Sequence, residues 1–252
     1  MNTIGVDIGS TFIKAAVFSL EEGRVLLRQV LPSPARLPHP DPRVFELDAK
    51  SLYDAVLALL RRAAERFPLS GLLLSTQMHG FVYRARNSGP DRYVSWQDSR
   101  SAAPLGNGKS ALDTFALRFP EDYWQTAGVR PKPSLGICNL YALLNGPRAP
   151  ARDGELFTLG SYLIAGLTGN NVCHLTNAAP LGLVDLERQD WNPETMRRLG
   201  LERVRLPRIA QTDFEVCGFA RIGGQKIPVF PDYGDQQVSV LGAGAENGNL
   251  LI

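Results

Sequence analysis

The order of strand-like segments and turns in the first third of the chain constrains the fold most strongly. Three segments rich in branched apolar residues read as strands: residues 3–8, 12–19 and 24–31. Only short polar turns separate them, and two tight turns between three strands predict an antiparallel meander. The chain is therefore expected to begin with an antiparallel sheet.

A helix and a buried strand follow this meander. Asp48 is a suitable N-cap. Apolar residues then recur at helical spacing: Leu52, Val56, Leu59, Leu60, Ala63 and Phe67. Pro68 is expected to end the helix. The unbroken apolar run at 71–75 is typical of a strand buried on both faces. Later strands are expected at 81–84, 93–96 and 226–230, and later helices at 160–167, 193–199 and 235–241.

Three meander strands, a helix and a parallel strand are the core order of the ribonuclease-H-like fold, which actin-like ATPases, sugar kinases and nucleases share. We therefore predict an α/β fold of this class. It should have a mixed five-stranded sheet, helices on both faces and an inserted, mostly helical segment over about residues 101–220. The 252 residues correspond to between one and two domains of about 150 residues. We expect one domain over residues 1–245, and the start of a truncated second domain at 246–252.

The charge and cysteine counts narrow the class of protein. Lysine and arginine total 27 against 25 acidic residues, and no basic stripe is visible, so nucleic acid is not an expected partner. No apolar stretch approaches the ~18 residues of a membrane helix, so no membrane partner is expected. Cys138, Cys173 and Cys217 are widely spaced, which favours a reducing, cytoplasmic location over a disulfide framework.

A polar turn lies between the first two predicted strands. Asp7 is near the end of the first strand, Gly9, Ser10 and Thr11 form the turn, and Lys14 lies on the second strand. The backbone N–H groups of such a turn can hold a phosphate, and the lysine can add a positive charge. A plain polar hairpin turn explains the same residues, so this short pattern leaves both interpretations open.

Gly234 and Asp235 follow a predicted strand and open a predicted helix. Asp235 could serve only as the N-cap of that helix, although Val238 stands where a capping box needs Glu or Gln. It could equally accept a proton from a substrate hydroxyl at the tip of the sheet.

Two further clusters follow predicted strands. The first comes after the buried strand, at the end where α/β proteins bind ligands: Gln77, Met78, His79 and Gly80. The second is Trp-Gln-Asp-Ser-Arg at 96–100. Here Asp98 either forms a surface pair with Arg100 or accepts hydrogen bonds from sugar hydroxyls. Taken separately, each cluster also has an ordinary structural explanation.

Taken together and in order, these motifs resemble the amino-terminal domain of the FGGY carbohydrate kinases over essentially the whole chain. Residues 7–14 resemble the family's first phosphate motif, and residues 77–80 the substrate strip of its xylulokinase-like branch. Residues 96–100 resemble the family's Trp-x-Asp-x-Arg element, in the form of the sedoheptulokinase-like branch. Residues 234–236 fall where the family has its catalytic aspartate, and Asp-Tyr-Gly at 232–234 replaces the glycine run of many relatives.

The resemblance implies a kinase that transfers the γ-phosphoryl group of ATP to a hydroxyl of a ketose or related polyol. Asp235 would be the general base. The sugar site would be lined by Asp235 with Gln77, Met78, His79 and Asp98. The phosphates of ATP would be held by Asp7, Gly9, Ser10, Thr11 and Lys14. Asp7 would also position Mg²⁺.

The resemblance further implies two partners, a sugar and a carboxyl-terminal ATP-binding domain. The family's second phosphate motif and adenosine motif are missing from residues 1–252, so this chain alone is expected to have little or no kinase activity. The identity of the sugar and the formation of a homodimer are left open.

Two other functions are compatible with the same core order. A two-metal nuclease would need clustered carboxylates, for which Asp7, Asp98 and Asp235 are the candidates, but it gives residues 77–80 no role. A non-catalytic actin-like or sugar-binding module is the second alternative.

Overall fold

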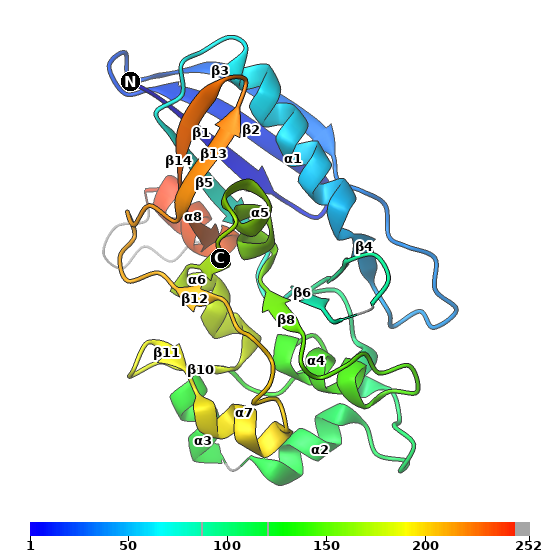
Figure 1. The fold of residues 1–252 in the computed structure, drawn as a ribbon. Helices are drawn as coiled ribbons and strands as arrows, with labels where there is room; N and C mark the ends of the chain where they lie inside the picture. The colour runs from blue at the N-terminus through cyan, green and yellow to red at the C-terminus, as the bar shows by residue number, and fades with distance from the viewer. Residues whose placement is uncertain (87, 120, 245–252) are drawn as a thin grey trace.

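The computed structural model describes residues 1–86, 88–119 and 121–244. Its main sheet has six strands in the order β13-β14-β5-β1-β2-β3 (Figure 1). These strands are β1 (Asn2–Ile8), β2 (Phe12–Ser19), β3 (Arg24–Pro32), β5 (Gly71–Thr76), β13 (Gly218–Ile222) and β14 (Gln225–Gly234). β5 runs parallel to both β1 and β14, and the other pairs are antiparallel. The predicted meander is confirmed. The sheet has one strand more than predicted, because β13 forms a hairpin with β14.

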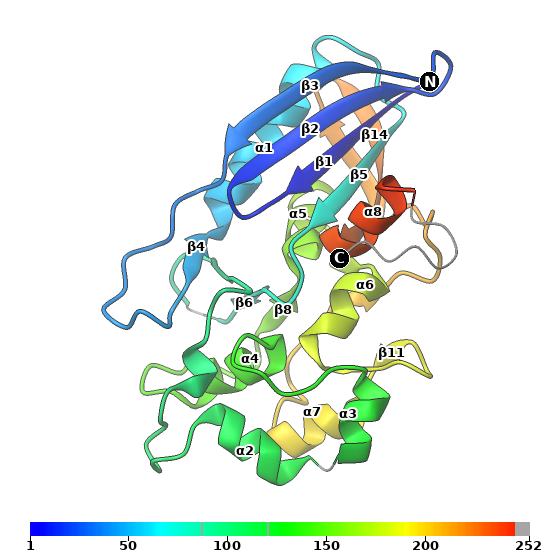
Figure 2. The same cartoon turned by 180° about the vertical axis from the view of Figure 1, so that it is seen from behind.

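Helices cover both faces of this sheet, as predicted. α1 (Ala49–Ala64) and α5 (Leu159–Thr168) pack on one face, and α8 (Asp235–Gly242) lies on the other (Figures 1 and 2). Alternate strand residues point toward α1 and α5 and form the main core, among them Ile4 and Val6 of β1 and Leu72 and Leu74 of β5. This alternation follows from the two-residue repeat of a β-strand.

The boundaries of α1 agree with the sequence at one end only. The Asp48 carboxylate caps the helix by accepting a 2.9 Å hydrogen bond from Ser51 N, as predicted. The helix ends at Ala64, before Pro68 is reached. Phe67 N and Arg66 N both donate to Ala63 O, which tightens the chain into a turn ahead of the proline.

A second, mainly helical region lies beyond the end of the sheet that carries α8 (Figure 2). Its helices are α2 (Ala111–Arg118), α3 (Glu121–Ala127), α4 (Gly136–Asn145), α6 (Leu175–Ala178) and α7 (Pro193–Leu199). A four-stranded sheet, β4-β7-β6-β8, joins it to the main sheet. Its strands are β4 (Glu46–Asp48), β6 (Phe81–Arg84), β7 (Arg92–Val94) and β8 (Glu155–Phe157). The predicted inserted helical segment is present, with an aromatic core of its own around Phe115, Phe119 and Trp124.

Short elements complete the described chain. They are β9 (Val172–Cys173), β10 (Val184–Asp185), β11 (Asp190–Trp191), β12 (Arg208–Ile209), and the 3₁₀ turns η1 (Arg100–Ala102) and η2 (Ala179–Leu181). None of the helices in the described ranges has both the length and the apolarity needed to cross a membrane. The predicted start of a second domain at 246–252 lies outside the described residues.

Candidate active site

The carboxyl ends of β1, β5 and β14 meet at one edge of the main sheet. Thr76, the last residue of β5, pairs with Ile8 on one side and with Gly234 on the other. The phosphate-like turn follows β1, residues 77–80 follow β5, and Asp235 follows β14. The fold therefore brings together three sequence motifs that are far apart in the chain, at the position where α/β sheets bind ligands.

The turn after β1 has the features of an anion site. Gly9 N donates to Phe12 O at 3.1 Å, which closes the turn and leaves Ser10 and Thr11 exposed. The backbone N–H groups of Ser10 and Thr11 donate to no residue within the described ranges. The Lys14 ammonium lies 3.8 Å from the Asp7 carboxylate, and Ser75 Oγ donates to that carboxylate at 3.1 Å.

Asp235 is the first residue of α8, and the N-cap is Gly234. The N-cap interpretation of Asp235 is therefore wrong, because strand β14 continues to Gly234, four residues beyond the predicted end at 230. Gln236 N donates to the Asp235 carboxylate at 2.8 Å. Burial raises the pKa of Asp235, and the negative charge of Asp7 raises it further. The two carboxylates are thus close enough for one to affect the titration of the other.

Met78 lies directly against the residue before Asp235. A β-carbon on Gly234 would be only 2.6 Å from Met78 Sδ, so the thioether occupies the space beside the start of α8. The strip of residues 77–80 therefore contacts the segment that carries Asp235. This contact joins the predicted sugar strip to the residue that precedes the predicted base.

His79 presents a hydrogen-bond acceptor at the same edge. Its Nδ1 lies 2.8 Å from Pro180 O, and a carbonyl can only accept, so Nδ1 carries the hydrogen and Nε2 is the acceptor. Burial lowers the pKa of His79, and the nearby Lys132 charge lowers it further, which favours this neutral ring. Lys132 Nζ lies 3.5 Å from Nε2. The backbone of His79 has a φ of +66°, a conformation that non-glycine residues seldom adopt outside functional or tightly held sites.

Gln77 and Tyr93 contribute buried polar groups near this strip. Both amide atoms of Gln77 and the Tyr93 hydroxyl are enclosed, and they have no hydrogen-bond partner among the described residues. A β-carbon on Gly80 would lie 2.2 Å from the Tyr93 hydroxyl, so this hydroxyl packs against the strip. Burial, with the charge of Asp235, raises the pKa of Tyr93.

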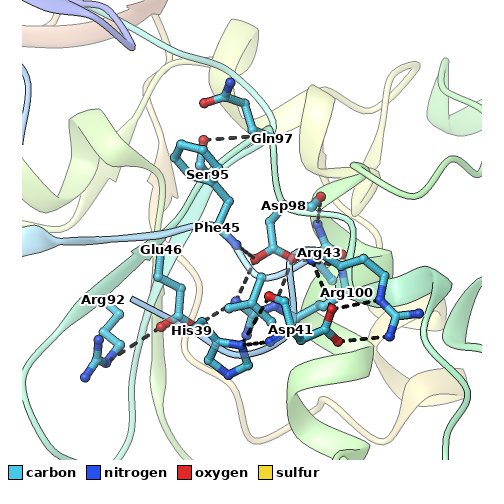
Figure 3. Close-up of polar contacts among 12 residues, drawn as sticks. His39, Asp41, Arg43, Phe45, Glu46, Arg92, Ser95, Gln97, Asp98 and Arg100 are labelled. Atoms are coloured by element: carbon cyan, nitrogen blue, oxygen red, sulfur yellow. Dashed lines mark hydrogen bonds and ion pairs between the residues drawn. The ribbon is translucent and has the colours of Figure 1, made fainter. Parts of the chain in front are cut away.

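Asp98 is held differently from the other predicted sugar ligands. It is fully buried, and its two carboxylate oxygens accept hydrogen bonds from Phe45 N at 2.7 Å and from the backbone and side chain of Arg100 (Figure 3). Arg100 also donates to Glu46 at 2.7 Å. Asn139 Nδ2 donates to the Asp98 carbonyl at 2.9 Å. The structure thus shows Asp98 joining three segments of backbone, and its contact with a sugar stays a prediction.

The expected surface pair of Asp98 and Arg100 is instead a buried one. Trp96, the first residue of the same motif, is 42% exposed and therefore does not belong to the core. α4 links this motif to the sugar strip. Its Asn139 contacts Asp98, and a β-carbon on its Gly136 would lie 2.9 Å from the carbonyl of His79.

Several residues near the site were not identified from the sequence. Lys132 and Tyr93 belong to no motif, and only their tertiary position brings them to the strip. Asp232 appeared only as a departure from a glycine run, yet it is a fully buried carboxylate. An acidic residue inside an otherwise apolar strand segment was the available signal, because a buried charge requires hydrogen-bonding partners.

Comparison with known proteins supports the family suggested by these motifs. Residues 142–242 match the model of the N-terminal domain of the FGGY family of carbohydrate kinases. A glycerol kinase of Cereibacter sphaeroides (strain KD131 / KCTC 12085) is 30% identical over 260 residues, which cover 95% of this chain and 50% of that protein. By these matches the chain is similar to the N-terminal domain of the FGGY family of carbohydrate kinases. It spans about half the length of the curated relatives that it matches.

Solved structures of a xylulose kinase and a glycerol kinase share the fold. A ligand-bound xylulose kinase from Lactobacillus acidophilus has a TM-score of 0.82 at 22% identity, and the match covers 97% of this chain and 50% of that one. A glycerol kinase of Plasmodium falciparum with ADP has a TM-score of 0.80 at 16% identity, over 96% and 50% of the two chains. The predicted ribonuclease-H-like class is confirmed by this likeness, which at these identities concerns the fold alone.

The residues around the turn after β1 fit a magnesium nucleotide. Mg²⁺ is usually held by one or two carboxylates together with substrate phosphates and water. Asp7 and Asp235 supply two such carboxylates, which interact electrostatically. The unpaired N–H groups of Ser10 and Thr11 and the Lys14 ammonium supply donors for phosphate oxygens. No group of three or more His, Cys, Asp or Glu side chains suited to a metal occurs in the described part of the chain. Phosphate oxygens would therefore complete the coordination.

Proposed function

We propose that this chain is the sugar-binding half of an ATP-dependent carbohydrate kinase. The γ-phosphoryl group of ATP is transferred to a hydroxyl of a ketose or related polyol. The observation that carries the proposal is the position of Asp235, which begins α8 beside the Met78 thioether and interacts with Asp7. A base, a sugar strip and an anion-binding turn at one edge of a sheet are the parts that phosphoryl transfer requires.

In this proposal Asp235 accepts the proton of the attacking hydroxyl. Burial raises the pKa of Asp235, so its carboxylate is a stronger proton acceptor than an exposed aspartate. His79 Nε2 accepts a hydrogen bond from a second hydroxyl, and the free amide of Gln77 can donate and accept. Met78 fills the space beside Gly234 and orients the sugar by contact.

The opposite side of the reaction is assigned to the turn after β1. Gly9, Ser10 and Thr11 offer backbone donors to phosphate, and Lys14 offers positive charge. ATP with Mg²⁺ supplies the transferable phosphoryl group, and Asp7 is the proposed ligand that positions the metal. The other side of the nucleotide site would be formed by a carboxyl-terminal domain. The relatives are about twice as long as this chain, which is long enough to include such a domain.

The proposal is tested by phosphorylation assays with the complete gene product and its Asp235→Asn variant. The substrates to be tested are D-xylulose, sedoheptulose and glycerol. Two of them are chosen because the similar proteins are a xylulose kinase and a glycerol kinase. D235N should lose at least about a thousandfold in kcat but still bind sugar. Asp54→Asn is the matched control, since Asp54 is an exposed acid on α1 that pairs with Lys50. Retained turnover in D235N would exclude Asp235 as the base.

Other parts of the proposal rest on less specific support. The cytoplasmic location rests on three buried free cysteines, which a reducing compartment would preserve. Sedimentation measurements would test whether the protein forms a homodimer. A sugar-binding module without catalysis would be favoured if the gene product bound these sugars but turned none of them over.

A further inference from the structure

Asp232 is a fully buried carboxylate near the end of β14, three residues before Asp235. One of its oxygens accepts hydrogen bonds from Thr158 Oγ1 at 2.9 Å and Asn177 Nδ2 at 2.8 Å. The other accepts from His174 N at 2.8 Å. Thr158 and His174 are the N-caps of α5 and α6. A single carboxylate thus joins the end of β14 to the first turns of two helices.

Asn177 extends this connection to the neighbouring strand. Its Nδ2 lies 2.8 Å from the Asp232 carboxylate and 3.0 Å from Thr76 Oγ1. Thr76 is the last residue of β5 and directly precedes Gln77. Asn177, Asp232 and Thr76 are all buried. One amide therefore contacts both the strand that leads to Asp235 and the strand that leads to the sugar strip.

The backbone pairing of β14 with β5 is interrupted near the end of β14. The register between β14 and β5 shifts between Val229 and Asp232, so the ladder is irregular where it reaches Asp232, and residues 232–234 then pair with residues 74–76. Gly234 N donates to Thr176 Oγ1 at 2.9 Å, which is a further bond from the strand end to α6. Side chains of α5 and α6 therefore supply much of what fixes the last residues of the strand.

We propose that Asp232 and Asn177 are a positioning pair, which sets the place of Asp235 relative to the strip of residues 77–80. The inference rests on the proposed function. Neither residue is placed in contact with the substrate, and both act through the strand ends that they join. The pair matters for rate because a misplacement of about 1 Å in a reacting group can cost about a hundredfold.

Steady-state kinetics of the complete gene product with D-xylulose and glycerol give the first readout. In the Asp232→Asn variant the new amide of residue 232 faces the amide of Asn177. The hydrogen bond that joins the end of β14 to α6 is therefore weakened. We expect kcat to fall at least about tenfold while KM stays within about twofold, because the Asn177 contact with Thr76 keeps the sugar strip in place. The double variant D232N/N177D again places an acceptor opposite a donor, and it should recover part of kcat.

Thr195→Val is the matched control for loss of a buried hydrogen bond. Thr195 is also fully buried, and its hydroxyl bonds to Tyr123 within the distant helical region. This variant should lose stability but retain wild-type kcat. If D232N behaves like T195V, with lower stability and unchanged kcat and KM, the positioning role is overturned.

Amide hydrogen exchange of the 252-residue chain gives a second readout that needs no activity. D232N should speed exchange at Gly234, whose N–H depends on the α6 contact, and T195V should not. If the wild-type gene product phosphorylates neither sugar, the proposed function fails, and the exchange result still decides the positioning pair. If D232N does not fold, Thr158→Val removes one donor, and Thr158→Ser keeps it. Equal exchange and kcat in these two Thr158 variants would overturn the inference.

Discussion

A β-carbon at position 160 would lie 2.1 Å from the Cβ of Asp232, so the Asp232 side chain occupies the space that Gly160 leaves empty. Gly160 is the second residue of α5, and Thr158, which caps the same helix, donates to Asp232. The start of α5 is therefore shaped around the carboxylate. A helix would ordinarily favour alanine over glycine, and here the tertiary contact outweighs that preference.

Replacing Gly160 with alanine should destabilise the fold. The added methyl group overlaps the Asp232 side chain, and overpacking of this kind costs about 1–3 kcal/mol. Urea unfolding followed by circular dichroism measures the loss. Gly242→Ala is the matched control, because Gly242 is also helical and has open space around its Cα. A G160A protein as stable as G242A would contradict the packing described here.

Stability should depend on pH through Asp232. Burial raises the pKa of Asp232 to about 7, against the opposing hydrogen bonds from His174, Thr158 and Asn177. The unfolded carboxyl has a pKa of about 3.9, so between these values the folded state holds a proton that the unfolded state has lost. The free energy of unfolding should therefore fall as pH rises from about 4 to about 7, by at most about 4 kcal/mol.

Comparison with Asp232→Asn isolates this contribution. The other titrating groups are common to both proteins, so the difference between the two curves belongs to position 232. The difference should change up to about pH 7 and then level off. Parallel curves across this range would show that Asp232 is already ionised in the folded protein.

The buried pair of Arg100 and Asp98 should be worth far more than an exposed one. Arg100→Met leaves the buried Asp98 carboxylate without its cation, and such a loss costs about 3–5 kcal/mol. Arg197→Met removes an exposed pair with Glu194 and should have a much smaller effect, because solvent screens exposed charges. Denaturant unfolding of the two variants side by side gives both values. Similar losses would mean that Asp98 is more hydrated than the structure shows.

Lys132 should act on the titration of His79. Burial is the larger cause of the lowered His79 pKa, and the Lys132 charge is the smaller one. Lys132→Met should therefore raise the His79 pKa but leave it below that of a free histidine. Proton NMR of the imidazole across the pH range measures the shift. Lys109→Met, an exposed lysine in a loop, serves as the control, and an identical shift in both variants would rule out a local effect.

Local sequence patterns predicted the elements that depend on local physics. The branched runs became β1, β2 and β3, and the helical spacing after Asp48 became α1 with the expected cap. The sequence pattern was wrong where the end of a strand depends on pairing with a strand that is distant in the sequence. β14 extends to Gly234, four residues beyond the predicted end at 230, because β5 pairs with it there. That extension is also why Asp235 begins the helix instead of capping it.

The sequence motifs predicted the site, and the tertiary structure determines which of their residues lie in it. Met78, His79 and Asp235 lie at one edge because β5 and β14 run parallel and end together. Asp98 was predicted alongside them, but its carboxylate bonds to Arg100 of the same motif and to Phe45 N, which comes from another loop. No spacing within residues 96–100 could reveal the bond to Phe45.

The sequence by itself determined the order of the first three strands, helix α1 and strand β5, the family resemblance and the chemical types available to the site. Only the tertiary structure decided that Asp232 is buried beside Gly160 and bonded to Asn177, and that Lys132 reaches His79. The physical reason is the range of the interactions. Strand and helix patterns arise between residues a few positions apart, whereas burial, hydrogen-bond partners and pKa values depend on residues that only the folded chain brings together.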